Sequence, residues 1–282
     1  MTAIGASCIA PPSLASVRFD EHRVDALRRF VKYAFPKRLH GTVLRLFLGA
    51  ARPFYAGARV VCPCCGAKFR AFVPYRIGPS RDSICPRCGS LRRHRFLLLY
   101  LRERTNLFQH PLRVLHVAPE ASLQALLRSV ATLDYTSIDL DSPIAMHAMD
   151  VTDLRYEDDW FDVILCSHVL EHVIDDRQAM REFFRVLRPG GWAILQSPVR
   201  RDAATTLEDP TVISPRDRER LFGQPDHVRW YGRDYTDRLA DAGFLVTEEC
   251  YADQMDDDTL ARYGLRRSAH AVYFCAKPSS TA

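Results

Sequence analysis

The chain has 282 residues, of which 47% are hydrophobic and 26% are charged. This length allows one or two domains with a packed core, so we do not expect a disordered chain. No apolar run approaches the ~20 residues that cross a bilayer, and the first fifteen residues lack the basic stretch that begins a secretory signal. We therefore expect a cytoplasmic protein without a transmembrane segment.

The charge is divided unevenly along the chain. Residues 1–113 carry 21 Lys and Arg against 5 Asp and Glu, a net charge of +16, whereas residues 114–282 carry 18 against 29, a net charge of −11. The basic half favours an anionic partner, which could be nucleic acid, a membrane surface or a small molecule.

Residues 1–58 are expected to form a flexible start followed by a basic helical arm. From Val24 to Ala51, apolar residues recur at three- and four-residue spacing among Arg and Lys. This pattern predicts two short amphipathic helices, broken at Pro36 and Gly41. The helices could pack on the protein itself or make a peripheral membrane contact.

Two C-x-x-C motifs, each followed by Gly, are separated by 19 residues. This spacing predicts a four-cysteine zinc site within a zinc ribbon over residues 59–95. Because tetrahedral zinc needs four thiolates, Cys62, Cys65, Cys85 and Cys88 are the expected ligands. Substitution of one of them by Cys64, or paired disulfides, are the alternatives. A small ribbon without a core relies on the metal for its stability.

Residues 96–282 alternate strand-like and helical patterns, which predicts an α/β domain. Strands are predicted at 112–118, 134–139, 147–150, 161–166, 192–195, 244–248 and 271–276, and helices at 122–130, 175–187 and 234–242. A turn is predicted at Pro189-Gly190-Gly191. Parallel sheets bind ligands beyond the carboxyl ends of their strands, where Ser167 and His168 lie.

Two acidic residues end predicted strands. Asp139 follows the end of the first strand by roughly 20 residues, where nucleotide-binding α/β units place a carboxylate on a ribose hydroxyl. Asp150 ends the third strand. The alternatives are that Asp139 caps a helix and that Asp150 lies in a solvated turn.

Over about residues 112–277 these motifs resemble the class I S-adenosylmethionine-dependent methyltransferases. The resemblance is carried by Val114-Leu-His-Val-Ala-Pro-Glu120, Ser137-Ile-Asp-Leu-Asp-Ser-Pro143, Asp150-Val-Thr-Asp-Leu154, Phe161-Asp-Val-Ile-Leu-Cys-Ser-His-Val-Leu-Glu-His-Val173 and Arg185-Val-Leu-Arg-Pro-Gly-Gly-Trp-Ala-Ile-Leu195. It implies a Rossmann-like, seven-stranded, mostly parallel sheet with helices on both faces and the last strand antiparallel. The chain also looks like a bacterial subgroup in which such a domain follows a ribbon ending Cys-Gly-Ser-Leu-x-Arg-His-Arg.

The resemblance implies S-adenosylmethionine as the cofactor and assigns its binding residues by position. Asp139, with Leu140 beside it, should bind the ribose hydroxyls, and Asp150 with Val151 should hold the adenine edge. Ser167 should border the methionine portion of the cofactor.

The first turn departs from the family pattern, which is an acid followed by Gly-x-Gly-x-Gly. His116 takes the place of the acid, while Ala118, Glu120 and Ser122 take the three glycine positions and Pro119 lies between the first two. We suppose that Glu120 pairs with the ammonium group of the cofactor in a charge-assisted hydrogen bond.

Methyl transfer is an in-line displacement at a sulfonium, so the protein must align a nucleophile and, where needed, take its proton. Histidine is the natural base near neutral pH, and His168, His172 and His227 are the candidates. The long segment 199–230 is predicted to be a lid over the substrate, with a solvated surface loop as the alternative.

Three functions follow from these features. The favoured one is methyl transfer to a small or carrier-bound metabolite, with anionic or sugar-containing compounds among the candidates. The first alternative is a methyltransferase of ribosomal or other RNA that binds through the basic zinc-ribbon half, although the ribbon lacks a run of exposed aromatic residues for stacking bases. The second is a non-catalytic zinc-binding scaffold of methyltransferase fold.

Overall fold

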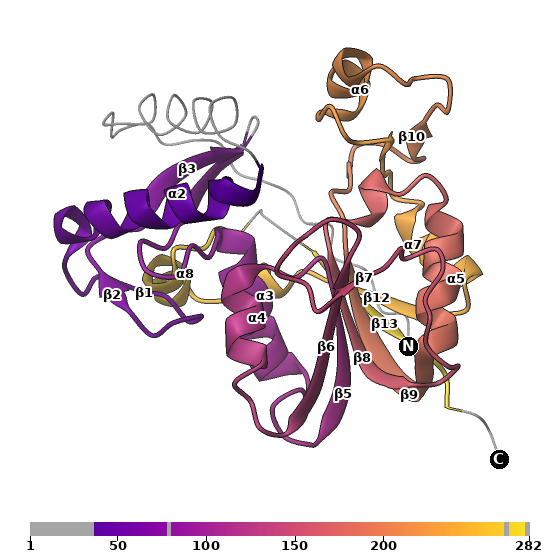
Figure 1. The fold of residues 1–282 in the computed structure, drawn as a ribbon, viewed down its shortest axis with the longest axis horizontal. Coiled ribbons are helices and arrows are strands. Elements are labelled where there is room, and N and C mark those ends of the chain that lie inside the picture. The colour runs from indigo at the N-terminus through magenta and orange to yellow at the C-terminus, as the bar shows by residue number, and fades with distance from the viewer. Residues whose placement is uncertain (1–36, 78–79, 268–270, 280–282) are drawn as a thin grey trace. The chain divides into compact units, whose positions relative to one another are not determined.

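The structure, a computed structural model, describes residues 37–77, 80–267 and 271–279 (Figure 1). The predicted flexible start and the beginning of the basic arm lie outside the described residues. Among those described, the chain forms two compact units. The first takes its residues from 37–104, 121–123 and 250–271, and the second from the rest. The sequence analysis predicted three segments, residues 1–58, 59–95 and 96–282.

The second unit contains a seven-stranded sheet with the strand order β12-β13-β9-β8-β5-β6-β7. Its strands are β5 (Leu112–Val117), β6 (Leu133–Asp139), β7 (His147–Ala148), β8 (Phe161–Ser167), β9 (Leu187–Gln196), β12 (Leu245–Glu249) and β13 (Val272–Ala276). Only β13 runs antiparallel to its neighbours. The predicted seven-stranded, mostly parallel sheet is therefore confirmed.

Helices lie on both sides of this sheet in Figure 1, with α4 (Ala121–Leu127) on one side and α5 (Asp176–Val186) and α7 (Tyr235–Asp241) on the other. Residues 161–166 of β8 are all buried, as expected for a central parallel strand covered on both faces. Met180 and Phe183 of α5 are fully buried as well. The core of the second unit therefore lies between the sheet and its helices.

The predicted turn at Pro189-Gly190-Gly191 is part of a strand instead. Helix α5 ends at Val186 and β9 begins at once with Leu187. Between the pairs Phe161–Leu187 and Val163–Trp192 the register shifts, so the extra residues of β9 bulge out of the ladder. A bulge accommodates a proline and two glycines because its residues need not pair with the neighbouring strand.

Segment 199–230 forms an excursion whose two ends meet. It contains β10 (Leu207–Glu208), α6 (Pro215–Phe222) and β11 (Arg229–Trp230), and β10 pairs antiparallel with β11. Val199 also bridges to Tyr231. At Gly232 the two arms cross so closely that a Cβ would lie 2.4 Å from the carbonyl carbon of Thr205. A residue without a side chain is therefore required at this crossing.

The first unit consists of two β-hairpins, flanked by helices. β1 (Val60–Val61) pairs with β2 (Lys68–Phe69), and β3 (Val73–Ile77) pairs with β4 (Ser80–Ile84). The arm helix α2 (Lys37–Ala51) is continuous through Gly41, where a break was predicted. Its Leu48 is buried among Val73, Ile84 and Leu91, so the described part of the arm packs on its own hairpins.

Buried Arg95 connects these hairpins to residues from the end of the chain. It lies in α3 (Arg92–Arg104), and its guanidinium donates to the carbonyls of Ser83, Ser90 and Tyr263. Tyr263 ends α8 (Asp257–Tyr263), which follows the short 3-10 helix η3 (Tyr251–Gln254). Within the part of the chain that is described, no helix is long and apolar enough to cross a membrane.

Candidate functional site

The strand order reverses between β5 and β8, and each of these strands is followed directly by a non-glycine residue with a strained, positive φ. Ala118, directly after β5, has φ 49°, and His168, directly after β8, has φ 58°. Each conformation is fixed from a neighbouring strand: Ala118 N donates to Ile138 O at 2.8 Å, and His168 N donates to Gln196 O at 2.8 Å. Open α/β sheets bind ligands at such a reversal, and strained backbone concentrates at functional sites.

The first turn is held together by a chain of three side chains. His116 is 1% exposed, with Nδ1 2.8 Å from the hydroxyl of Tyr135 and Nε2 3.1 Å from a carboxylate oxygen of Glu120. Burial raises the pKa of Tyr135, so its hydroxyl stays protonated and can donate to Nδ1. With Nδ1 as an acceptor, Nε2 carries a ring proton and donates it to Glu120. His116 thus positions the carboxylate of Glu120.

The two predicted nucleotide-binding acids each make local hydrogen bonds through one oxygen. Asp139 Oδ1 accepts from the backbone N–H groups of Asp141 and Ser142, at 2.8 and 2.7 Å. Asp150 Oδ1 accepts from both the N–H and the hydroxyl of Thr152, each at 2.8 Å. Both acids therefore cap turns, and within the described residues no hydrogen bond is made to either Oδ2.

The neighbours of these acids differ in exposure. Leu140 is 64% exposed, whereas Val151 is 7% exposed. Pro119, in the first turn, is buried, and Ser167 at the end of β8 is half-buried. The predicted cofactor-binding residues thus lie at or just beyond the carboxyl ends of β5, β6, β7 and β8.

His168 is oriented by a buried carboxylate that the sequence analysis did not identify. Its Nδ1 lies 3.2 Å from Glu171 Oε1, and the Ser197 hydroxyl donates to Glu171 Oε2 at 2.9 Å. Burial acts to raise the pKa of Glu171, but the hydrogen bond and charge of His168 outweigh it, so the pKa lies below 4.5. An ionised Glu171 accepts the Nδ1 proton, so in the neutral form of the His168 ring the lone pair lies on Nε2.

His172 and His227 form a second pair next to Glu171. The two rings are nearly perpendicular, with their centroids 4.7 Å apart. His172 is 34% exposed at its side chain, whereas His227 is buried and its Nε2 has no hydrogen-bond partner among the described residues. Burial lowers the pKa of His227 below its ordinary 6.5, so its ring is neutral at neutral pH.

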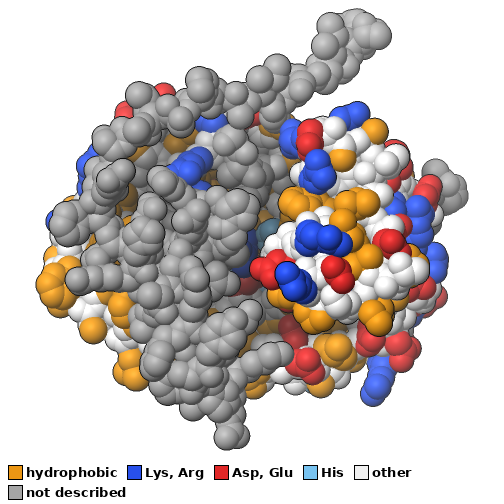
Figure 2. All heavy atoms as spheres, turned by 90° about the horizontal axis from the view of Figure 1, so that it is seen from above, with side chains coloured by type: hydrophobic (Ala, Val, Ile, Leu, Met, Phe, Trp, Pro, Cys, Tyr) orange, Lys and Arg blue, Asp and Glu red, His pale blue; other side chains and the backbone are white. Residues whose placement is uncertain are grey.

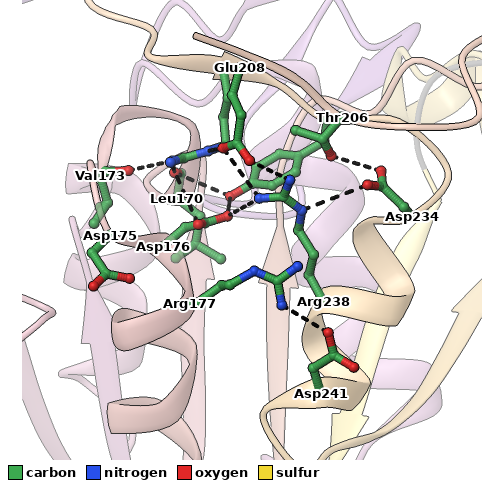
Figure 3. Close-up of polar contacts among 12 residues, drawn as sticks. Leu170, Val173, Asp175, Asp176, Arg177, Thr206, Glu208, Asp234, Arg238 and Asp241 are labelled. Atoms are coloured by element: carbon green, nitrogen blue, oxygen red, sulfur yellow. Dashed lines mark hydrogen bonds and ion pairs between the residues drawn. The ribbon is translucent and has the colours of Figure 1, made fainter. Parts of the chain in front are cut away.

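The base of segment 199–230 is anchored by an ion-pair network, part of which Figure 3 shows, with three buried members and one exposed member, Glu208. Arg238 of α7 contacts Asp176 at 3.2 Å and Glu208 at 2.6 Å. Arg229 contacts Glu208 at 3.0 Å and also donates to the carbonyls of Leu170 and Ile174 at 2.8 Å. These bonds attach β10 and β11 to the turn that carries Glu171 and His172.

The outer part of this segment is held more loosely. Helix α6 buries only Phe222. Leu207 and Ile213 are 43% and 76% exposed, and the upper lobe of Figure 1, seen from above in Figure 2, shows hydrophobic side chains among charged ones. The segment thus combines a fixed base with an outer part that has little buried area.

The four predicted zinc ligands come together in the first unit, and their sulfur atoms lie within 4.8 Å of one another. The sulfurs of Cys62 and Cys88 are 3.6 Å apart, and those of Cys65 and Cys85 are 3.8 Å apart. Four thiolates around tetrahedral zinc would lie about 3.8 Å apart, since each Zn–S bond is about 2.3 Å. The cluster therefore fits the ion.

The two cysteine knuckles have the same backbone structure. Gly66 N donates to Cys62 O at 2.8 Å, and Gly89 N donates to Cys85 O at 3.0 Å. Both glycines have positive φ, 70° and 73°. The Gly that follows each C-x-x-C motif is thus explained by the turn that it makes.

The sequence of the second unit matches a known family over residues 105–195, described as "Methyltransferase domain". The match begins just before β5 and ends in β9, so it includes the turns with His116, Asp139 and Glu171. Over these residues the chain is therefore similar to a methyltransferase domain.

Two curated relatives match shorter stretches. Ajmaline N-methyltransferase of Rauvolfia serpentina is 36% identical over 63 residues, 22% of this chain and 22% of the relative. Demethylmenaquinone methyltransferase of Clavibacter sepedonicus is 42% identical over 50 residues, 18% of this chain and 20% of the relative. The matched stretches span about a fifth of the length of each of these relatives.

Solved structures are similar at low identity. The [4+2]-cyclase SpnF has a TM-score of 0.45 and 18% identity, covering 66% of this chain and 82% of that one. An S-adenosylmethionine-dependent methyltransferase from Mesorhizobium loti has a TM-score of 0.43 and 17% identity, covering 59% and 90%. Such scores carry no information about a substrate.

Replacing Glu208 tests the anchoring network. Burial acts to raise the pKa of Glu208, but hydrogen bonds from Arg238 and Arg229 outweigh it, so the pKa lies below 4.5. Stability from a lowered carboxyl pKa is present above the unfolded pKa and is lost as the pH falls through the folded one. We expect Glu208→Gln to lose about 1–2 kcal/mol of unfolding free energy at pH 7, moderated by its partial exposure, and less at pH 3.

Urea unfolding between pH 7 and pH 3 measures this difference. Glu219→Gln is the matched control, because Glu219 is exposed on α6 and no described residue bonds its side chain. A Glu208→Gln deficit that stays constant across this pH range would contradict the assignment.

Proposed function

We propose that the protein is an S-adenosylmethionine-dependent methyltransferase that acts on a small or carrier-bound metabolite. The methyltransferase-domain match over residues 105–195 and the sheet topology support the cofactor. The observation that carries the catalytic proposal is the buried Glu171 carboxylate behind the ring of His168.

The residues at the strand ends fit the cofactor. Asp139 keeps one carboxylate oxygen available for the ribose hydroxyls, with Leu140 exposed beside it, and Asp150 with Val151 is placed for the adenine edge. When bound, the cofactor supplies an electrophilic methyl group on a sulfonium. Ser167 borders its methionine portion.

The altered first turn supports binding rather than a scaffold that has lost the cofactor. Ala118 adopts the positive φ for which glycine is the usual residue, so the turn exists without the family glycines. Pro119 fixes its own φ, and His116 holds Glu120, whose carboxylate is proposed to pair with the cofactor's ammonium group.

His168 is the proposed base. Its Nε2 is left as an acceptor, its side chain is 29% exposed, and Glu171 stabilises the ring when it takes a proton. His172 and His227 are the less favoured candidates, because the Nδ1 atom of each contacts a backbone carbonyl. Among the described residues, the ion pair between either ring and a carboxylate is that of His172 with Asp226, at 3.7 Å. A catalytic base is useful when the methylated substrate loses a proton as it accepts the methyl group.

A small acceptor is supported by the names of the two relatives, an N-methyltransferase of ajmaline and a methyltransferase of demethylmenaquinone. Segment 199–230, placed beside Glu171 and His172, is proposed as the lid. The RNA alternative rests on the charge of residues 1–113, many of which lie outside the described part of the chain.

Calorimetry with S-adenosylhomocysteine tests the cofactor site. We expect Asp139→Asn to weaken binding about 10- to 100-fold, because it loses a charged hydrogen-bond acceptor. Asp141→Asn should bind like the parent, since the side chain of exposed Asp141 makes no hydrogen bond to a described residue. Absence of heat with the folded parent would instead favour the scaffold.

Methyl transfer from labelled S-adenosylmethionine tests the base and the acceptor class. The two acceptor pools are a bacterial metabolite extract freed of macromolecules and bulk RNA at low salt. We expect label in the metabolite pool, reduced about 10²- to 10⁴-fold by His168→Gln with unchanged affinity for S-adenosylhomocysteine. The control is exposed His110→Gln. Label confined to RNA would favour the alternative, and undiminished transfer by His168→Gln would exclude this base.

We also propose that Cys62, Cys65, Cys85 and Cys88 bind one zinc ion that stabilises the first unit. The fit of their sulfur separations to tetrahedral coordination supports this. Cys64, also buried and reduced, is not part of the four-sulfur group.

Metal analysis of the purified chain should give at least one zinc per chain. Cys88→Ser should lose this metal and unfold the first unit, because small ribbons depend on their ion. Cys166→Ser, in the core of the second unit, is the control that should keep it. A parent that is folded with well under one zinc per chain would refute the assignment.

A further inference from the structure

Three metal-ligating groups meet beside the proposed base. They are the carboxylate of Glu171, the imidazole of His172 and the imidazole of His227, and one donor atom of each lies within 4.8 Å of the other two. Glu171 and His172 belong to the 3-10 helix η2 (Leu170–His172) just after β8, and His227 comes from segment 199–230. The group is separate from the cysteine cluster and shares no residue with it.

The hydrogen bonds of the two imidazoles determine which nitrogen can bind an ion. His172 Nδ1 lies 3.1 Å from the carbonyl oxygen of Asp226, and His227 Nδ1 lies 3.1 Å from that of Phe222. Because a carbonyl oxygen only accepts, each neutral ring carries its proton on Nδ1 and a lone pair on Nε2. Metal-binding histidines are usually held in this way by a backbone carbonyl or a carboxylate.

The Nε2 atom of His227 provides an independent observation. Its residue is 5% exposed, and this nitrogen has no hydrogen-bond partner among the described residues. A buried polar atom left unpaired costs about 1–3 kcal/mol. The ring of His172, 4.7 Å away between centroids, cannot satisfy it, because both Nε2 atoms are acceptors. A cation or a donor is needed at Nε2 of His227.

We propose that Glu171, His172 and His227 bind a divalent first-row transition ion of the zinc type. Two imidazoles and one carboxylate suit such an ion, whereas magnesium and calcium prefer oxygen ligands throughout. Glu171 retains lone pairs after bonding His168 and Ser197, because an ionised carboxylate offers about four acceptor sites. Its negative charge would offset part of the charge of the ion.

To bind an ion, the three donor atoms need only small local movements toward one another. Donors around a tetrahedral ion with bonds of about 2.05 Å lie about 3.4 Å apart, so separations of up to 4.8 Å must shorten. The side chain of His172 is 34% exposed, which leaves its ring room to move and gives the ion a route from solvent. Three protein ligands leave coordination positions for water or for an oxygen atom of another molecule.

Cobalt(II) titration of the full chain, carrying one equivalent of zinc in its cysteine site, tests this proposal. A nitrogen and oxygen site gives weak visible bands, whereas cobalt that displaces zinc from thiolates gives intense charge-transfer bands, so the two sites are distinguishable. We expect one equivalent of cobalt with weak bands, displaced by zinc and not by excess magnesium.

The variants His172→Gln and His227→Gln should each raise the dissociation constant of this second equivalent at least about 100-fold, since each removes a direct ligand. His110→Gln is the matched control and should bind like the parent. His172 is partly exposed, so its variant should fold even if the variant of buried His227 does not. Absence of a second equivalent in the folded parent, or equal binding by His172→Gln, would overturn the proposal and leave a water molecule between the rings.

Discussion

The buried carboxylate of Glu171 connects the candidate catalytic groups to one another. Its side chain is 2% exposed and bonds His168 and Ser197, while its backbone carbonyl accepts from Val228 N at 2.9 Å. A charge at this depth must be compensated by hydrogen bonds and opposite charge, because it has lost its hydration. The same residue therefore sets the ring of His168 and the place where segment 199–230 returns to the sheet.

A second buried carboxylate, Asp176, secures that segment from the other side. Together with Glu208 it balances the guanidinium groups of Arg229 and Arg238. Such a network adds little net stability relative to apolar packing, but any mispaired docking would leave a charge buried alone. The network thus fixes the position of the base of segment 199–230. Helix α6 is held less firmly, because Phe222 is its only buried residue.

Local patterns predicted most of the sheet and only part of the site. The apolar runs of β5, β6 and β8, and the C-x-x-C spacing, are visible in the sequence because burial and ligand geometry dictate them locally. Glu171 and Asp176 could not be identified, because their burial and their bonds to Ser197 and Arg238 involve residues 26 or more positions away. The same holds for Arg95, which binds Tyr263 at the far end of the chain. His168 and His172, which flank Glu171 in the same motif, were recognised as candidates. Glu171 itself was not, because a charged residue is expected at the surface unless its burial is known.

The first turn has a positive φ although it lacks the Gly-x-Gly-x-Gly pattern. Glycine is the usual residue where a turn needs a positive φ. Ala118 nevertheless adopts a positive φ here, and the hydrogen bond from its N–H to the carbonyl of Ile138 holds it in this conformation. The energy of that strain has to be offset by the surroundings. Buried His116, fixed between Tyr135 and Glu120, ties the end of β5 to β6 and to the start of α4. His116, which takes the place of the usual acid, thus positions the carboxylate of Glu120, and the negative charge lies four residues further along the chain.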